Sequence, residues 1–124
     1  MRGTVKSKAE IDSLFKNGRR YKARGLILIT NPTPEQRGHS GRVAYIAGKK
    51  LGKAPLRNRA KRLMREAVSR AGGAIPGIDM VYVAQGKLLG MEFSQIEAEC
   101  KRLRGQVLVD ISGLSGERTA AGEE

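Results

Sequence analysis

Apolar residues recur at helical spacing in three parts of the chain. Residues 7–18 begin with a Ser-x-x-Glu capping box, and residues 94–109 begin with a second one at Ser94. In residues 56–71 one side of the helical wheel is apolar, and Pro55 stands where a helix can begin. The pattern predicts three amphipathic helices with these apolar faces: Ile11, Leu14 and Phe15; Leu56, Ala60, Leu63, Met64, Ala67, Val68 and Ala71; and Ile96, Cys100, Leu103 and Val107.

Other segments have the pattern of extended chain. Residues 19–30 read as extended, and within them 26–29 is a continuous apolar run typical of a strand buried on both faces. Gly25 marks a bulge or a break in that segment. Residues 42–47 and 79–85 predict two further strands, while the Pro, Gly and Asn residues of 31–41 are typical of a loop.

The length of 124 residues fits one domain with a core of its own. We expect residues 1–110 to form that domain and residues 111–124 to form a disordered acidic tail. Cys100 is the only cysteine, which excludes an intramolecular disulfide and agrees with a reducing, cytoplasmic setting.

The chain has a net charge of +12. So strong a positive charge predicts a polyanionic partner. No apolar run approaches the roughly 20 residues that a membrane span needs, and the N-terminus lacks the apolar core of a signal peptide. Charge therefore favours nucleic acid as the partner over a membrane.

The positive charge is concentrated in residues 49–70, which contain nine basic residues and one acid, Glu66. On the wheel of residues 56–71 the cations form an arc beside the apolar face. A solvated helix face is the plain alternative, but such faces usually mix both signs of charge. Phosphates favour a one-sign surface, since each neutralised phosphate releases counterions and arginine forks match phosphate oxygens.

The segment R-N-R-A-K-R-L-M-R-E, residues 57–66, with the preceding G-K-K-L-G-K-A, resembles the signature of the bacterial ribonuclease P protein. The resemblance extends over residues 4–110 and includes the F-K-N-G ending of the first helix and the D-M-V-Y-V-A strand. It implies an α+β domain of order αβββαβα with a left-handed β-α-β crossover, like the second domain of a small-subunit ribosomal protein. It also implies a third early strand near residues 19–24.

The resemblance implies a protein that assists a catalytic RNA. That RNA, with bound Mg²⁺, would hydrolyse a phosphodiester of precursor tRNA and release the 5′ leader. No protein partner would be required, and no metal or catalytic group would belong to the protein. The residues expected to contact the RNA subunit are Lys49, Lys50, Lys53, Arg57, Asn58, Arg59, Lys61, Arg62 and Arg65.

A separate cleft, between the first helix and the sheet, would hold the single-stranded leader. Its expected walls are Ile11, Phe15, Ile29 and Tyr45. Family members often carry aromatic residues where this chain has Ile11 and Ile29, so base stacking would be weaker here. Core packing is the alternative role for Ile11, Phe15 and Ile29.

Groups suited to protein-based nuclease chemistry are sparse. Acidic residues form no dense cluster of the kind that holds catalytic metal ions, and Glu66 and Asp79 are expected to be structural. His39 stands alone in a Gly-rich loop, Cys100 lies on an apolar stripe, and no phosphate-binding P-loop is present. An independent nuclease is therefore disfavoured. A non-enzymatic RNA binder, such as a ribosomal protein or RNA chaperone, remains the alternative.

Overall fold

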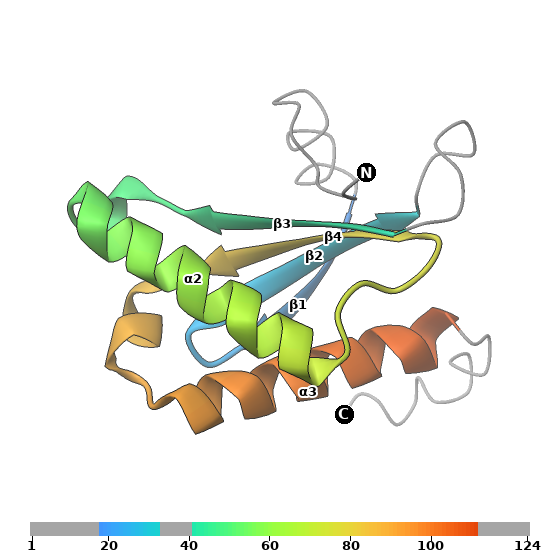
Figure 1. The fold of residues 1–124 in the computed structure, drawn as a ribbon. Helices are drawn as coiled ribbons and strands as arrows, with labels where there is room; N and C mark the ends of the chain where they lie inside the picture. Colours follow the sequence, from blue (N-terminus) through green and yellow to red (C-terminus); the bar gives the residue numbers. More distant parts are fainter. Residues whose placement is uncertain (1–17, 33–40, 112–124) are drawn as a thin grey trace.

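The computed structural model describes residues 18–32 and 41–111, which form a four-stranded sheet and two α-helices (Figure 1). Two short 3-10 helices, η2 and η3, follow the third and fourth strands. In chain order the elements are β1 Arg19–Ala23, β2 Leu26–Pro32, β3 Arg42–Ala47, η2 Lys49–Leu51, α2 Ala54–Ala71, β4 Ile78–Ala84, η3 Gly86–Gly90 and α3 Phe93–Ile111. Residues 7–17 of the helix expected over residues 7–18 lie outside the described residues, as do the loop residue His39 and the tail from residue 112.

The segment predicted as extended chain over residues 19–30 is a hairpin of β1 and β2. Gly25 lies in the connecting turn with φ of +82°, so it marks a strand break rather than a bulge. A Cβ at this glycine would lie 3.2 Å from the Leu88 Cα and closer still to the Met91 sulfur. The turn therefore needs glycine for its backbone conformation and for its contact with η3.

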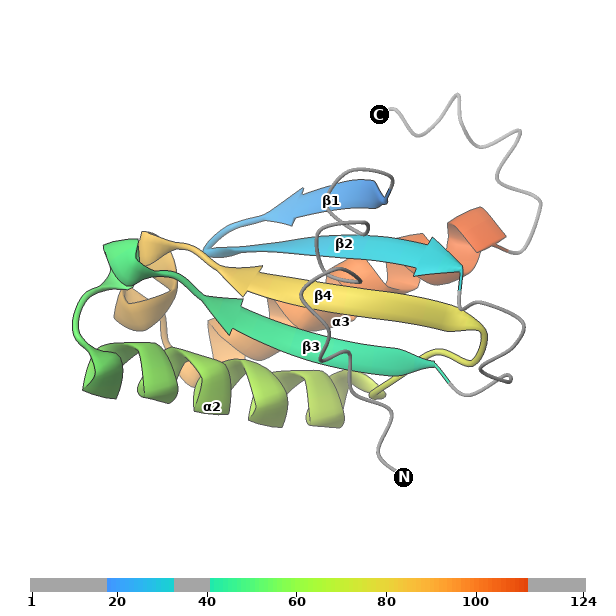
Figure 2. The same cartoon turned by 90° about the horizontal axis from the view of Figure 1, so that it is seen from above.

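The strands are ordered β1-β2-β4-β3, with β1 and β4 antiparallel to β2 and with β3 parallel to β4. Both helices cover the same face of the sheet (Figure 1). Figure 2 shows the sheet from the opposite face, with the helices behind it; turned so that β3 and β4 point up, β4 lies to the right of β3 in that view. From the helix-covered side, β4 therefore lies to the left of β3. The β3-α2-β4 crossover is therefore left-handed, as expected, and is an exception to the right-handed rule.

The main core lies between the sheet and the two helices. The predicted stripe of α3 is buried along its whole length, and Ala60, Met64, Ala67 and Val68 of α2 are buried opposite it. The exception on α2 is Leu56, which was expected in the core but is 43% exposed. Leu56 lies in the first turn of α2, where its side chain lies against Gly52 instead of reaching the sheet.

The opposite face of the sheet carries a second apolar cluster. Ile29, Ala44 and Val81 are buried there, and three partly buried residues extend the cluster along the same strands: Ile27, Ile46 and Val83. The register explains this grouping, because Ile29 and Ala44 are both paired with Val81 across neighbouring strands. We call these six residues the open-face cluster, a name that means only that neither α2 nor α3 covers them, because Ile29, Ala44 and Val81 are themselves buried.

The start of α3 differs from the expected capping box at Ser94 and Glu97. The helix begins at Phe93, and the Gln95 side chain accepts a hydrogen bond from the Glu92 backbone N–H at 3.0 Å. Glu97 instead pairs with Lys101 one turn later, at 3.5 Å. The structure therefore forms only the Gln half of a capping box, between residues 92 and 95, two residues before the expected pair of Ser94 and Glu97.

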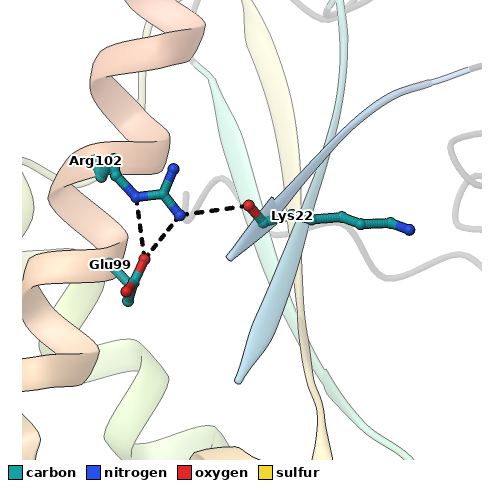
Figure 3. Close-up of polar contacts among 3 residues, drawn as sticks. All are labelled: Lys22, Glu99 and Arg102. Carbon is teal, nitrogen blue, oxygen red and sulfur yellow. Dashed lines mark hydrogen bonds and ion pairs between the residues drawn. The ribbon is translucent and has the colours of Figure 1, made fainter. Parts of the chain in front are cut away.

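Polar contacts attach the ends of these elements to one another. Arg42 and Asp79, which are partners in the β3–β4 register, form a buried ion pair at the start of both strands. On α3, Arg102 forms an ion pair with Glu99 at 2.9 Å and also lies 3.5 Å from the Lys22 carbonyl oxygen of β1, as Figure 3 shows. The Lys22 side chain points away from α3, toward the open face (Figure 3).

Candidate nucleic-acid interface

The cations predicted to bind RNA lie on one continuous part of the chain, from the end of β3 through α2. Lys49 and Lys50 are exposed on η2, and Lys53 is exposed at the N-cap of α2. Pro55 occupies the first turn, as expected for a helix start. We call the following set the basic surface: Lys49, Lys50, Lys53, Arg57, Asn58, Arg59, Lys61, Arg62 and Arg65.

The N-terminal end of α2 adds to the positive potential of the basic surface. No acidic residue lies in the first turn, and Lys53 provides no side-chain cap for the backbone N–H groups there. Free N–H groups and the helix dipole make such an end favourable for anions. Backbone and side chains therefore contribute charge of the same sign.

The structure separates the cations of α2 into two degrees of burial. Arg59, Arg62 and Arg65 are exposed, whereas Arg57 and Lys61 are half-buried along the side of the helix nearer the sheet. The Nε of Arg57 is buried and has no hydrogen-bond partner among the described residues. A buried donor without a partner costs free energy and is rare in folded proteins, so it calls for an acceptor such as a water, an ion or a ligand.

Charge on the basic surface is not neutralised by its own helix. The one acid of α2, Glu66, pairs with Arg70 at 3.1 Å, and both side chains are exposed. Within residues 18–32 and 41–111, no carboxylate lies within ion-pair distance of a cation of the basic surface. The predicted concentration of like charge on one helix is therefore confirmed as a structural feature.

Arg65 is held by an aromatic contact. Its guanidinium carbon lies 5.3 Å from the centre of the Tyr45 ring. The Tyr45 ring stacks in turn on Tyr82, with centroids 6.0 Å apart and ring planes 20° apart. Tyr82 is fully buried, so these three side chains run from the core to the basic surface. Burial raises the pKa of the Tyr45 hydroxyl, which is therefore neutral at pH 7.

Ile29 and Tyr45 cannot wall the same cleft, which corrects the sequence prediction. Ile29 belongs to the open-face cluster, whereas Tyr45 is paired in register with Tyr82 and packs against the main core on the helix-covered face. The two side chains project from opposite faces of the sheet. The other two expected cleft residues, Ile11 and Phe15, lie outside the described residues.

A pocket that the sequence did not indicate lies where the parallel strands β3 and β4 end. It has a volume of about 460 Å³. Ile46 and Val83 of the open-face cluster line it, and Lys49 and Lys50 of η2 also contribute to its wall. Gly48 and Gly86, which follow β3 and β4, also line the pocket. The sequence shows both glycines, but only the parallel pairing of β3 and β4 reveals that they lie at the same edge of the sheet.

The acids and the cysteine that the sequence analysis weighed for protein-based hydrolysis, Glu66, Asp79 and Cys100, are occupied in ion pairs or buried. Glu66 and Asp79 form the ion pairs with Arg70 and Arg42. Cys100 is fully buried, and burial raises the pKa of its thiol to about 12. Among residues 18–32 and 41–111, no three His, Cys, Asp or Glu side chains gather as metal ligands. In the same ranges, neither helix has the length and apolar character to cross a bilayer.

The sequence is similar to one known family of proteins along most of its length. The family described as Ribonuclease P matches residues 2–107. A ribonuclease P protein component from Nitratiruptor is 33% identical over 100 residues, covering 81% of this chain and 87% of the relative. One from Symbiobacterium thermophilum is 34% identical over 100 residues, covering 80% and 85%.

Solved structures share the fold. The RNase P protein of Staphylococcus aureus superposes with a TM-score of 0.74 at 23% identity, covering 86% of this chain and 96% of that protein. The RNase P protein of Thermotoga maritima gives a TM-score of 0.70 at 22% identity, covering 82% and 94%. At these identities the superpositions show that the fold is shared, and the sequence matches show the family.

Proposed function

The chain belongs to the ribonuclease P protein family, and from this membership we propose that it is the protein subunit of ribonuclease P. In this proposal it joins a catalytic RNA and assists removal of the 5′ leader from precursor tRNA in the cytoplasm. The observation that carries the proposal is the basic surface, whose nine residues coincide with the family signature and whose cations have no acidic partner among the described residues.

The basic surface would bind the catalytic RNA. Exposed arginines on one side of α2 can engage successive phosphates, and the open N-terminal end of the helix favours a further one. Arg57 brings a buried donor that has no acceptor among the described residues, which a phosphate oxygen would satisfy. Asn58 is exposed between these cations and would add hydrogen bonds.

The leader would lie across the open face of the sheet. Ile29 stays in this proposal, and the pocket beside Ile46 and Val83 offers an apolar floor for a base, with Lys49 and Lys50 near enough for its phosphates. Ile11 and Phe15 remain proposed walls from the sequence. Tyr45 leaves the leader cleft, since it lies on the other face.

Chemistry in this proposal belongs to the RNA subunit, with Mg²⁺ held mainly by that RNA. The protein would act by charge and position. Its cations would offset repulsion between RNA phosphates, so that the RNA needs less Mg²⁺, and its leader contacts would favour precursor over mature tRNA. No membrane and no further protein would be needed.

The test is 5′-leader cleavage of a precursor tRNA at low Mg²⁺ by a bacterial ribonuclease P RNA, with and without this protein. We expect cleavage at the mature 5′ end when both are present and little when either is absent. The Mg²⁺ concentration at half-maximal rate should fall on adding the protein.

Two other outcomes would overturn the proposal. Cleavage by the purified protein alone, retained after nuclease-contamination controls, would make it an independent nuclease. Tight RNA binding without any stimulation of a cognate catalytic RNA would instead favour a non-enzymatic RNA binder, such as a ribosomal protein or RNA chaperone.

A further inference from the structure

The cations of α2 differ in how firmly the protein holds them. Arg59 and Arg62 are exposed, and no ion pair or ring contact joins them to the rest of the described chain. Arg70 is held twice, by Glu66 at 3.1 Å and over the Phe93 ring at 5.3 Å, so its charge is already compensated. Arg65 is the intermediate case: it is held by a ring, yet no carboxylate of residues 18–32 and 41–111 pairs with its charge.

The ring that holds Arg65 is itself fixed. Tyr45 is half-buried at β3, the outer strand nearer α2, and stacks on the fully buried Tyr82 of the next strand. Met80 and Cys100 of the same core cluster are also fully buried, so Tyr45 packs against the buried main core. The guanidinium therefore rests on a rigid surface rather than on another mobile side chain.

We propose that Tyr45 is a positioning residue of the basic surface and acts through Arg65. The inference rests on the proposed function, because it concerns how the same surface binds the catalytic RNA. A guanidinium held over a ring by this attraction makes no hydrogen bond in the contact, so its N–H donors stay available to meet a phosphate in bidentate fashion. The side chain is ordered before the RNA arrives, so less rotamer entropy is lost on binding.

Two substitutions of Tyr45 distinguish the effect of its aromatic ring from the effect of its volume. Tyr45→Phe keeps the ring and its stacking on Tyr82 but removes the hydroxyl. Tyr45→Leu fills much of the same space and keeps an apolar contact with the core, but it offers no ring face to Arg65. Each is made in the wild-type chain and in an Arg65→Ala chain, which gives two double-mutant cycles.

The readout is the dissociation constant of each variant for a bacterial ribonuclease P RNA at fixed salt and Mg²⁺, with the melting temperature measured alongside. We expect Tyr45→Leu to weaken binding about threefold to fivefold when Arg65 is present. The same substitution should have less than a twofold effect in the Arg65→Ala chain. Tyr45→Phe should restore most of the affinity lost in Tyr45→Leu.

A purely structural role for Tyr45 predicts a different pattern. Tyr45→Leu would then weaken binding equally in both chains, in step with its loss of melting temperature, and that result would overturn the inference. If Arg65→Ala itself leaves affinity unchanged, the inference fails while the proposed function stands on the remaining cations. If the wild-type protein does not bind the catalytic RNA, the proposed function fails first.

Discussion

Tyr21 and Tyr82 project from the same face of the sheet in one cross-strand row, with Leu28 between them, yet their hydroxyl groups are in opposite situations. The Tyr21 hydroxyl donates a 2.5 Å hydrogen bond to Asp110 of α3, and burial together with that carboxylate raises the pKa of Tyr21 to about 12. The Tyr82 hydroxyl is buried with no partner in the described structure. Whether a buried polar atom stabilises the fold therefore depends on its hydrogen-bond partner rather than on its residue type.

This contrast predicts opposite effects of the same chemical change. Tyr21→Phe removes a hydrogen bond to a charged group and should lower the free energy of unfolding by about 1–2 kcal/mol. Tyr82→Phe removes an unsatisfied hydroxyl and should leave that free energy unchanged or raise it by about 1 kcal/mol. Urea unfolding of both variants at pH 7 checks the pair. Equal losses in both would mean that Tyr82 has an acceptor.

Cys100 should be chemically silent while the protein is folded. Its thiol is fully buried, and burial raises the thiol pKa from 9.0 to about 12, so the reactive thiolate is scarce at neutral pH. We expect labelling by a disulfide reagent at pH 8 to be very slow in buffer and rapid in denaturant. Fast labelling of the folded protein would contradict this burial.

The same thiol contributes to the pH dependence of stability. Because its pKa is raised in the folded state, its contribution is fully present below pH 9 and is lost as the pH rises toward 12. Cys100→Ala should therefore show a smaller loss of unfolding free energy than the wild-type chain between pH 9 and the highest pH at which the fold survives. Parallel pH profiles for the two chains would count against the shift.

At the scale of elements, two glycines show how the β1–β2 turn and α3 are constrained. Gly25 has φ of +82° and lies against the backbone of Leu88, so a side chain there meets strain and a close contact. Gly105 lies inside α3, where an added Cβ would meet nothing within 4 Å. One glycine is required by its surroundings, and the other only weakens a helix.

Substitution by alanine should separate these two cases. Gly25→Ala should lower the free energy of unfolding by about 1–2 kcal/mol, because the turn requires a conformation that alanine disfavours. Gly105→Ala should raise it by about 0.5–1 kcal/mol through helix propensity. Thermal unfolding of the two variants, measured side by side, checks the signs. A destabilised Gly105→Ala chain would reveal a contact at that helix face.

Elements with strong local sequence signals could be predicted. Which residues of different strands share one face of the sheet could not. Residues 42–47 form β3 within the predicted bounds, and the apolar stripe of α3 is buried as expected. These features follow from the period of apolar residues and from local turn chemistry. Whether Ile29 and Tyr45 share a face depends on how β2, β4 and β3 are paired, which is a long-range property. For this reason the sequence could not show that Ile29 and Tyr45 lie on opposite faces and cannot wall one cleft. The cations of the basic surface were easier to group, because they belong to one helix and the short segment before it.

At the scale of the whole molecule, the net charge of +12 and the basic surface make a salt-dependent interaction the expected behaviour. Affinity for the catalytic RNA should fall steeply as salt rises, with the logarithm of the association constant linear in the logarithm of salt concentration. The slope counts the phosphates engaged, so it reports how many cations of the surface take part.

Arg62→Ala should lower the affinity at every salt concentration and reduce the magnitude of that slope by about 1. The matched control is Arg102→Ala, which deletes one arginine from α3 beside β1, at the edge of the sheet farther from α2. Equal reductions of slope in both variants would mean that the RNA senses net charge alone. An unchanged slope in Arg62→Ala would remove Arg62 from the binding face.

The charges on β1 have a consequence for the protein when no RNA is bound. Among the described strands β1 is an outer one, and three of its five residues, Arg19, Arg20 and Lys22, are cationic. Asp110 of α3 pairs with Arg19 at 3.1 Å and offsets part of this charge. Outer strands can template the growth of intermolecular sheets, but two copies meeting along β1 would bring like charges face to face. The edge is therefore protected against aggregation, and free protein awaiting its partner should remain monomeric at concentrations where an uncharged edge would polymerise.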